Sequence, residues 1–573
     1  MKYIFILFLL ILFLFPLIAI ESFKQIKYGP AQVIKEEQPS FKYEYEDIYK
    51  NLYKKVLNGE KEMYVSQRQY YEQYQEFTVK KDPNVIRIFI IGGSVAHGWE
   101  DAISIDEDIV IGKKLEIINV GMPGYDSYRV KLIAQELLSY EPDAIVVLTG
   151  NNEYYNQQGF NLTAYKLNKY FLRYHLYYYL KNSINHLISR YANKYHKDRE
   201  KTLDYFEKNL RSIVRSARSK RVPLILCTLP MNLHGMSSLM LPSDNYFLLG
   251  KLSFENEKYS DAIKYLRYFN SRNPENIYGY YYLGQVYEEL KDYKEAKENY
   301  LKSVEFSDDD YVTPSRNKVI RKISREEDTG FIDLESIVMR TAKNDITGRE
   351  QFNDHCHIWD EYYQLFDKAL IKEFTNNTSD YLRIFGSDKN DKMIPYSNEP
   401  FQAPSLKELG KNEDYISNRI EQAAFNAIEA VSGYSERALY NFKTLYLMNP
   451  EYLWNIQFSK DSIERDLLEN KYVNNIFFKN SFDSKWPKVI NHIAETYRRM
   501  NLYKEADVYY DKAIELDKDS YLPYLGKALL NCSQGNHNEV LKNIEKAKEN
   551  ANENLSEVQY YKDIILKTIN LAN

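Results

Sequence analysis

The chain has 573 residues, enough for several domains, and a net charge of only −5 from 76 basic and 81 acidic side chains. It has no basic footprint, so we expect no nucleic acid partner. Its three cysteines, Cys227, Cys356 and Cys532, are too few for a disulfide framework or a four-thiolate zinc site.

An apolar segment opens the chain. Lys2 precedes an almost unbroken apolar run over residues 3–20, close to the ~20 residues that cross a bilayer. Residues 18–22 form a poor cleavage site, and no cysteine lies near enough for lipoprotein processing. We therefore predict a signal anchor at residues 1–22, which tethers an extracytoplasmic chain to the cell membrane. A cleaved signal, giving a secreted or periplasmic protein, and a buried helix are the alternatives.

The segment after the anchor and the five apolar runs that follow it differ in pattern. Residues 23–83 are polar and tyrosine-rich with few helix breakers, which predicts a helical stalk. Short apolar runs then occur at residues 85–91, 116–120, 144–149, 222–228 and 330–334. Because amphipathic helical segments separate these runs, they predict a doubly wound α/β domain in two parts, residues 84–242 and 308–378. Binding sites in such domains form at the carboxyl ends of the strands.

An internal repeat interrupts this alternation at residues 243–307. The following residues recur 34 positions later: Tyr246, Gly250, Tyr259, Ala262 and Leu266 as Tyr280, Gly284, Tyr293, Ala296 and Tyr300. A period of 34 with small residues at helix crossings predicts a pair of tetratricopeptide repeats. We expect this pair to pack at the carboxyl ends of the strands.

The same period returns in residues 379–573, which we predict to be an all-α domain of similar repeats. There Tyr503 aligns with His537 and Ala513 with Ala547, while Tyr434, Ala438 and Pro450 mark a degenerate copy in residues 415–450. Ordinary helical hairpins are the alternative, above all for residues 400–480.

Four short motifs carry chemistry at the ends of the predicted strands. They are GGSVAHG with Ser94, NVGMPG with Gly121, GNNE with Asn152, and DHCH with Asp354 and His357. A serine nucleophile needs a base, a group that orients the base, and donors for the developing oxyanion. The four motifs in this order supply all of these groups.

Each motif also has an ordinary interpretation. Gly-Gly-Ser after a strand can be a turn, NVGMPG a strand-to-helix loop, and GNNE a helix cap. DHCH can be a surface turn or a metal site formed by Asp354, His355 and His357, although no other His/Cys cluster supplies further ligands. We therefore expect neither a metal nor a cofactor.

Together the motifs resemble those of the SGNH or GDSL-type hydrolases, over roughly residues 84–242 and 308–375. The resemblance implies a flavodoxin-like α/β/α sandwich with Ser94 as nucleophile, His357 as base and Asp354 as its partner. It also implies an oxyanion hole formed by the N–H groups of Ser94 and Gly121 and the side chain of Asn152.

The chain more closely resembles an exported bacterial subgroup with a tetratricopeptide insertion before the last motif. Its further marks are Pro-x-Asn, here Pro230 and Asn232, and Pro-x-Arg, here Pro314 and Arg316. Two positions depart from the family pattern, since Gly93 and Glu153 stand where the family usually has Asp. An α/β-hydrolase is the nearest rival, but residues 92–96 lack the last glycine of its G-x-S-x-G elbow.

The resemblance implies an esterase or acyltransferase that acts on O-acyl esters of a small molecule or glycan, with envelope carbohydrate as one candidate. Lipid esters are an alternative, since residues 170–195 are aromatic-rich and amphipathic. The second class of function is a membrane-anchored scaffold in which the hydrolase domain is idle and the repeats bind a protein partner.

Overall fold

The computed structural model describes residues 51–67, 75–99, 114–153, 199–235, 242, 244–307, 312–375, 401–428, 435–456, 460, 463, 482–551 and 554–572. The chain divides into two compact units, residues 1–77 with 157–205 and residues 78–156 with 206–573. The predicted anchor at residues 1–22 and the aromatic segment at residues 170–195 lie outside the described residues. Within the described ranges, no helix is long and apolar enough to span a membrane.

The helical stalk predicted for residues 23–83 is wrong where the structure describes it. A three-stranded sheet stands there, with β1 (Tyr53–Asn58) antiparallel to β2 (Lys61–Ser66) and β3 (Glu76–Thr78) beside β2. Gly59 opens the two-residue hairpin turn with φ +62°, a conformation that glycine adopts without strain. The tyrosines that suggested a helix instead pack cross-strand: the Tyr53 and Tyr64 rings lie 4.9 and 5.2 Å from that of Phe77.

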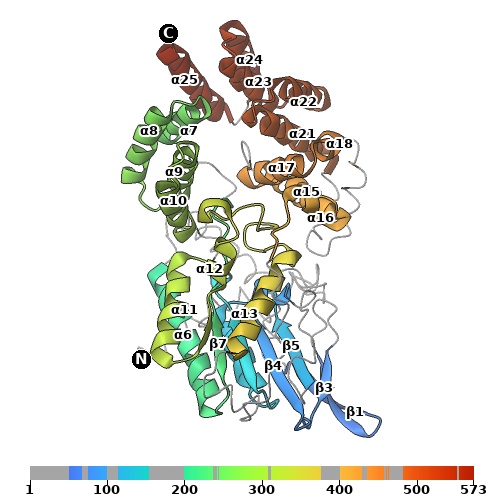
Figure 1. Cartoon of the computed structure of the whole chain (residues 1–573). Coiled ribbons are helices and arrows are strands. Elements are labelled where there is room, and N and C mark those ends of the chain that lie inside the picture. Colours follow the sequence, from blue (N-terminus) through green and yellow to red (C-terminus); the bar gives the residue numbers. More distant parts are fainter. Residues whose placement is uncertain are drawn as a thin grey trace, which may run out of the picture. The chain divides into compact units, whose positions relative to one another are not determined.

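A second, parallel sheet forms the centre of the α/β domain (Figure 1). Its strands are β4 (Val85–Gly92), β5 (Lys114–Gly121), β6 (Ala144–Leu148), β7 (Leu224–Cys227) and β8 (Gly330–Ile332). They lie in the order β5-β4-β6-β7-β8, which is the flavodoxin-like order. Every residue of β6 and β7 is buried, as expected for strands covered on both faces. All five predicted strands are confirmed.

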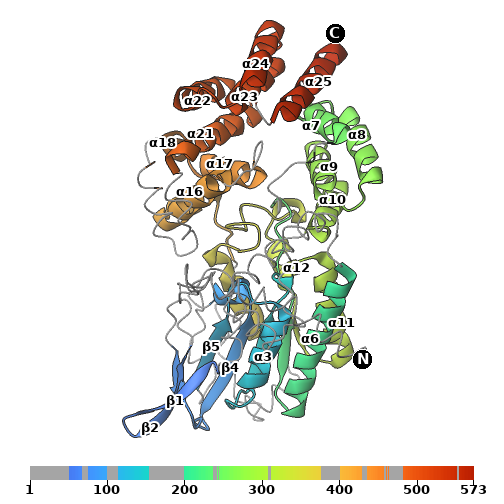
Figure 2. The same ribbon diagram turned by 180° about the vertical axis from the view of Figure 1, so that it is seen from behind.

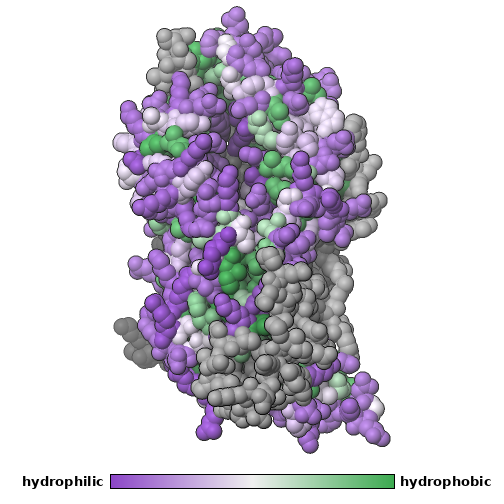
Figure 3. Space-filling view, in the orientation of Figure 1, coloured by the Kyte–Doolittle hydropathy of each residue, from purple (hydrophilic) through white to green (hydrophobic). Residues whose placement is uncertain are grey.

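Helices cover both faces of this sheet. Helix α13 (Tyr363–Thr375) lies over the face seen in Figure 1, and α3 (Ser127–Leu137) and α6 (Arg199–Ser219) lie over the face seen in Figure 2. Helices α11 (Pro314–Glu327) and α12 (Leu334–Met339) flank β8 in the chain, and α11 packs against β7 and β8. The predicted α/β/α sandwich is confirmed. Its strands are apolar and buried, whereas the coloured residues on the face shown in Figure 3 are mostly polar.

The insertion consists of two helical hairpins. Helices α7 (Asn245–Glu255) and α8 (Tyr259–Arg272) form the first, and α9 (Ile277–Glu289) and α10 (Tyr293–Glu305) the second. A Cβ on Gly250 would lie 2.6 Å from the Leu266 side chain, and one on Gly284 would lie 2.7 Å from the Tyr300 ring. Each glycine thus lets its two helices cross closely, at positions equivalent in the repeat.

The C-terminal region is all-α in its described residues, as predicted. Its helices are α15 (Leu406–Leu409), α16 (Glu413–Ile428), α17 (Glu436–Met448), α18 (Pro450–Asn455), α21 (Phe482–Arg499), α22 (Tyr503–Leu516), α23 (Leu522–Ser533), α24 (His537–Asn550) and α25 (Leu555–Ala572). Helices α22 and α24 begin at Tyr503 and His537, the two residues that the sequence aligned 34 positions apart. The 34-residue period therefore corresponds to one pair of antiparallel helices per repeat.

Candidate active site

The predicted nucleophile stands on a tight turn at the end of the central strand β4. A Cβ on Gly92 would lie 1.8 Å from the Leu148 carbonyl oxygen, so only glycine fits between β4 and β6. Ser94 begins the short helix α2 (Ser94–His97) and is half-buried. The turn therefore presents the serine at the carboxyl end of the sheet, where sites of this fold form.

Asn152 lies beside this turn. It follows β6, is buried, and donates a hydrogen bond from Nδ2 to the Tyr125 carbonyl oxygen at 3.1 Å. A Cβ on Gly93 would lie 2.6 Å from the same Nδ2. The Asn152 amide therefore packs directly against the Gly93 position, beside the nucleophile. The structure brings Asn152 next to Ser94 across neighbouring strands.

Gly121 is placed differently from its predicted role. Its N–H donates to Asn119 Oδ1 at 2.8 Å, and a Cβ there would lie 2.3 Å from the backbone nitrogen of His97. Gly121 therefore serves the close packing of β5 on α2, and its N–H is already engaged.

Gly124, three residues further along the same loop, has geometry better suited to an oxyanion donor. It has φ +72°, is half-buried and immediately precedes Tyr125, whose carbonyl holds Asn152. Within the described part of the chain its N–H donates no hydrogen bond. We infer that Gly124 is the better candidate for the second backbone donor.

The second departure, Glu153, fixes the loops around Asn152. Its carboxylate accepts hydrogen bonds from the Ser127 backbone N–H at 2.8 Å and from the Ser127 hydroxyl at 2.7 Å. Burial, together with the charge of Asp126, raises the pKa of Glu153 to about 7, against the opposing charge of Arg316. Arg316, of the Pro-x-Arg motif, also donates to the Gly150 carbonyl oxygen at 2.9 Å. These contacts fasten the start of α3 and the start of α11 to the segment that carries Asn152.

The DHCH motif forms the tip of a tight turn, residues 352–358, which we call the base turn. An antiparallel bridge pairs Phe352 with Ile358, and the Asn353 N–H donates to the His357 carbonyl oxygen at 2.8 Å. Asp354 Oδ1 accepts the backbone N–H groups of Cys356 and His357, each at 2.7 Å. Asp354 Oδ2 lies 2.6 Å from His357 Nδ1.

This geometry defines an oriented imidazole. Burial alone would lower the pKa of His357, but the Asp354 carboxylate raises it well above its ordinary value. Burial likewise opposes ionisation of Asp354, yet the charges of His357 and His355 hold its pKa well below the usual range. The His357 side chain keeps 34% of its surface exposed. A carboxylate that fixes Nδ1 leaves Nε2 as the nitrogen that can exchange a proton with a neighbour.

His355 and Cys356 complete the turn. His355 Nδ1 lies 3.9 Å from Asp354 Oδ1, so the hydrogen bond with Asp354 belongs to His357. Ligand atoms of Asp354, Cys356 and His357 lie within 4.8 Å of one another and could hold a metal ion. This set differs from the metal alternative expected from sequence, because Cys356 takes the place of His355.

Two further residues connect the base turn to the sheet. Asn232, of the Pro-x-Asn motif, donates from Nδ2 to the Asp354 carbonyl oxygen at 2.7 Å. Tyr363, at the start of α13, donates from its hydroxyl to the Val95 carbonyl oxygen at 3.0 Å, next to Ser94. The chain after His357 therefore touches the nucleophile turn. No hydrogen bond joins Ser94 to His357 in the described part of the structure.

The sequence analysis missed Gly124, Cys356 and Tyr363. Gly124 stands in the NVGMPG motif that was singled out, and only its positive φ distinguishes it from Gly121. Tyr363 is one of many tyrosines, and no local pattern marks it.

Comparisons with known proteins give two kinds of result. Models of the tetratricopeptide repeat match residues 277–310 and residues 487–520. Among solved structures, a GDSL-like lipase from Bacteroides thetaiotaomicron is 13% identical with a TM-score of 0.25, covering 50% of this chain and 86% of its own. A protein described as an acylhydrolase from Bacteroides fragilis is 13% identical with a TM-score of 0.26, covering 51% and 88%. No curated protein matches the chain.

The strand order and the repeat matches define the class of protein. The chain contains a flavodoxin-like parallel α/β domain and tetratricopeptide repeats. The repeats stand both in the insertion and in the C-terminal region, as expected from the 34-residue period.

Proposed function

We propose that this chain is a serine esterase or acyl hydrolase that works through an acyl-enzyme. The observation that carries the proposal is the 2.6 Å hydrogen bond between Asp354 and His357, on a turn tied to the sheet edge where Ser94 stands. An oriented histidine at the same edge as a serine on a strand-end turn is the arrangement that activates a hydroxyl.

In this mechanism Ser94 Oγ attacks the acyl carbonyl carbon while His357 Nε2 accepts the hydroxyl proton. Asp354 stabilises the imidazolium that results. The carbonyl oxygen becomes an oxyanion, which accepts hydrogen bonds from the Ser94 N–H, the Asn152 side-chain amide and the Gly124 N–H. His357 then donates its proton to the departing alcohol, and a water activated by the same nitrogen releases the acid from Ser94. Attack by a second alcohol in place of water would make the same site an acyltransferase.

The substrate class and the location belong to the same proposal. An apolar run at residues 3–20 behind Lys2 supports a membrane-tethered, extracytoplasmic enzyme. An enzyme on that side meets O-acyl groups of envelope or secreted carbohydrate, and we propose these as substrates.

A second candidate is a binding scaffold with an idle hydrolase domain. The two repeat matches favour it, because tetratricopeptide repeats present extended surfaces to protein partners.

Labelling of the purified ectodomain with a fluorophosphonate probe distinguishes the two. The probe reacts with an activated serine, so we expect one labelled peptide, containing Ser94. A folded protein that remains unlabelled would favour the scaffold. Screening acetylated glycans and small acyl esters then tests the substrate class.

A further inference from the structure

The base turn is held by helices of the C-terminal region as well as by its own domain. Arg419, on α16, donates from one guanidinium nitrogen to Asn353 Oδ1 at 2.9 Å and from another to Asn441 Oδ1 at 2.6 Å. Asn353 directly precedes Asp354, and its backbone N–H closes the turn onto the His357 carbonyl. One side chain 66 residues downstream in sequence thus holds the residue that directly precedes the catalytic motif.

Arg419 is built in as a fixed group. It is fully buried, and its guanidinium lies 5.1 Å from the centre of the Trp359 ring. A buried guanidinium is costly unless it is hydrogen-bonded, and Arg419 Nε has no partner among the described residues, so the bonds to Asn353 and Asn441 are the ones that stabilise the group. Burial lowers the pKa of Arg419 to about 10, so it remains charged at neutral pH.

Helix α17 supplies a second set of contacts. Asn232 Nδ2, which donates to the Asp354 carbonyl oxygen, also lies 3.4 Å from the Tyr440 hydroxyl. Arg349, just before the base turn, donates to Thr444 Oγ1 at 3.2 Å and lies 4.5 Å from the centre of the Tyr440 ring. Side chains of α17 therefore contact the segment just before the base turn and Asn232, which holds the Asp354 carbonyl.

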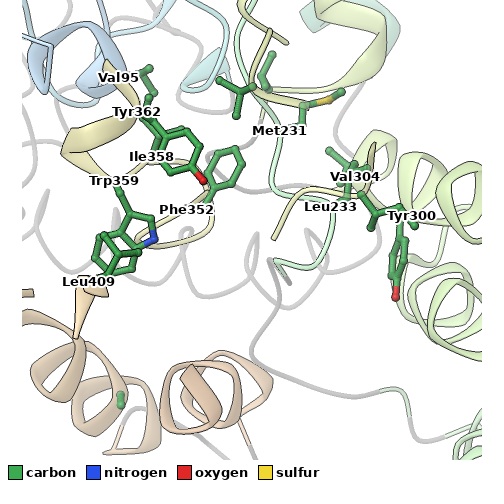
Figure 4. Packing of buried hydrophobic residues seen from close by; sticks show 14 of the residues in the cluster. Val95, Met231, Leu233, Tyr300, Val304, Phe352, Ile358, Trp359, Tyr362 and Leu409 are labelled. Atoms are coloured by element: carbon green, nitrogen blue, oxygen red, sulfur yellow. The ribbon is translucent and has the colours of Figure 1, made fainter. Parts of the chain in front are cut away.

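An apolar contact supports the polar ones. Trp359, which follows the base turn, donates from its indole N–H to the Arg349 carbonyl oxygen at 2.9 Å. Its ring lies 4.8 Å from that of Tyr415 on α16, and Figure 4 shows it beside Leu409 of α15. The base turn and the C-terminal helices thus share one hydrophobic core.

We propose that Arg419 is a positioning residue of the active site, which through Asn353 fixes the turn that carries Asp354 and His357. The C-terminal repeat region is then a working part of the enzyme and not only a docking surface. This inference rests on the proposed function, because the geometry that it fixes is that of the base.

The test compares Arg419→Met with a matched variant in the full-length protein. Arg419→Met keeps the aliphatic bulk over Trp359 and removes both hydrogen bonds. We expect kcat for a small ester, and the rate of fluorophosphonate labelling, to fall about 10- to 100-fold with KM within twofold, as for a misplacement near 1 Å. Asn353→Ala, at a half-buried position, should have a similar effect, and the double variant should be no slower than the slower single one.

The matched control is Arg498→Met on α21. Arg498 is also buried and pairs with Glu495 of α21 at 2.8 Å and with Glu255 of α7 at 3.3 Å, neither of which belongs to the base turn. Arg498→Met should lower the melting temperature. It should not slow probe labelling of Ser94 when the two variants are compared at a temperature at which both are folded. A second measurement is the downfield proton resonance of the Asp354–His357 hydrogen bond, which should shift or broaden in Arg419→Met and stay unchanged in Arg498→Met.

The outcomes separate the two proposals. Wild-type labelling and an unchanged resonance in Arg419→Met would overturn the positioning role, as would equal slowing in Arg498→Met. Failure of the wild-type protein to label at all would overturn the proposed function. In that case the resonance still reports whether Arg419 holds the turn.

Discussion

The two halves of the proposed site are held in place in different ways. Ser94 and Asn152 stand at the ends of neighbouring strands, and the sheet itself fixes them through close contacts between β4 and β6. In the described residues, the base turn does not directly follow a strand of the central sheet. It depends on Asn232 from the loop after β7, on Tyr363 from α13, and on Arg419 from α16.

This difference bears on how each half can be altered. A strand-end position cannot shift without distorting the sheet, whereas a turn held by side chains from three segments moves when any one of them is removed. We therefore expect substitutions around Ser94 to act through the reacting groups themselves. Substitutions around His357 should act also through remote contacts.

The largest effect is expected when the nucleophile itself is removed. Ser94→Ala should lower kcat by at least about 10³-fold, because the hydroxyl forms the covalent intermediate. Ser139→Ala is a suitable control, since that exposed hydroxyl donates to the Glu136 carbonyl oxygen on α3. Turnover of a confirmed substrate and probe labelling measure the effect. Near-normal turnover in Ser94→Ala would show that another residue is the nucleophile.

The corresponding substitution in the base half is His357→Ala. It should abolish probe labelling, whereas His355→Ala should only weaken it, because the 2.6 Å hydrogen bond with Asp354 belongs to His357. The pair is closely matched, since both histidines lie on the same turn beside the same carboxylate. Stronger loss in His355→Ala would reverse the assignment of the base.

Removal of one oxyanion donor should cost less. Asn152→Ala should lower kcat about 10²- to 10³-fold with little change in KM, the usual size for one such donor. Asn151→Ala, at the neighbouring position, controls for disturbance of the loop after β6. A loss under threefold would mean that the oxyanion is stabilised elsewhere.

The contrast between the halves also explains what the sequence could predict. Five apolar runs that end in glycine or polar residues predicted the five strands. Ser94 and Asn152 could be located in the same way, because the end of a strand is a local feature of the sequence. Spacing alone paired Asp354 with His357 on one turn. The strands at residues 53–66 were missed because tyrosine-rich, alternating polar segments resemble an exposed helix, and the only strong turn signal was Asn58–Gly59.

The remaining features depend on contacts between distant segments. Arg419 and Asn353 are 66 residues apart, and neither stands in a motif. Gly124 is favoured over Gly121 as an oxyanion donor because the Gly121 N–H donates to Asn119 Oδ1, and that depends on where the Asn119 side chain lies. Such facts require the packed structure.

The pH dependence of catalysis should reflect the base half alone. His357 must be neutral to accept the serine proton, and Asp354 raises its pKa above the ordinary value of 6.5. The ratio kcat/KM should therefore rise about tenfold per pH unit up to that pKa, with its midpoint above pH 6.5, and then level off. Asp354→Asn removes the negative charge that favours the imidazolium, so the residual activity should have its midpoint at lower pH. A midpoint that stays fixed would separate Asp354 from the base.

The smallest expected effect concerns the insertion, and in particular one of its contacts with the α/β domain, that between His234 and Glu288. His234 Nε2, in the loop after β7, lies 2.9 Å from Glu288 Oε2 of α9, and both side chains are partly exposed. Tyr300 donates to the same oxygen at 2.8 Å, so Glu288 keeps a partner when His234 is replaced. An ion pair of this exposure contributes less than about 1 kcal/mol.

His234→Gln should therefore leave probe labelling of Ser94 within twofold of wild type and lower the melting temperature by less than about 4 °C. Tyr300→Phe is the matched variant, because it removes the other hydrogen bond to Glu288 while keeping the ring at the helix crossing against Gly284. Circular dichroism melts and labelling rates measure both effects. The backbone N–H of His234 donates to the Thr347 carbonyl oxygen, which connects the loop after β7 to the segment before the base turn. If His234→Gln slowed labelling as much as Arg419→Met, the insertion would hold the base turn as firmly as α16 does. The C-terminal region would then not differ from the insertion in its effect on the base turn.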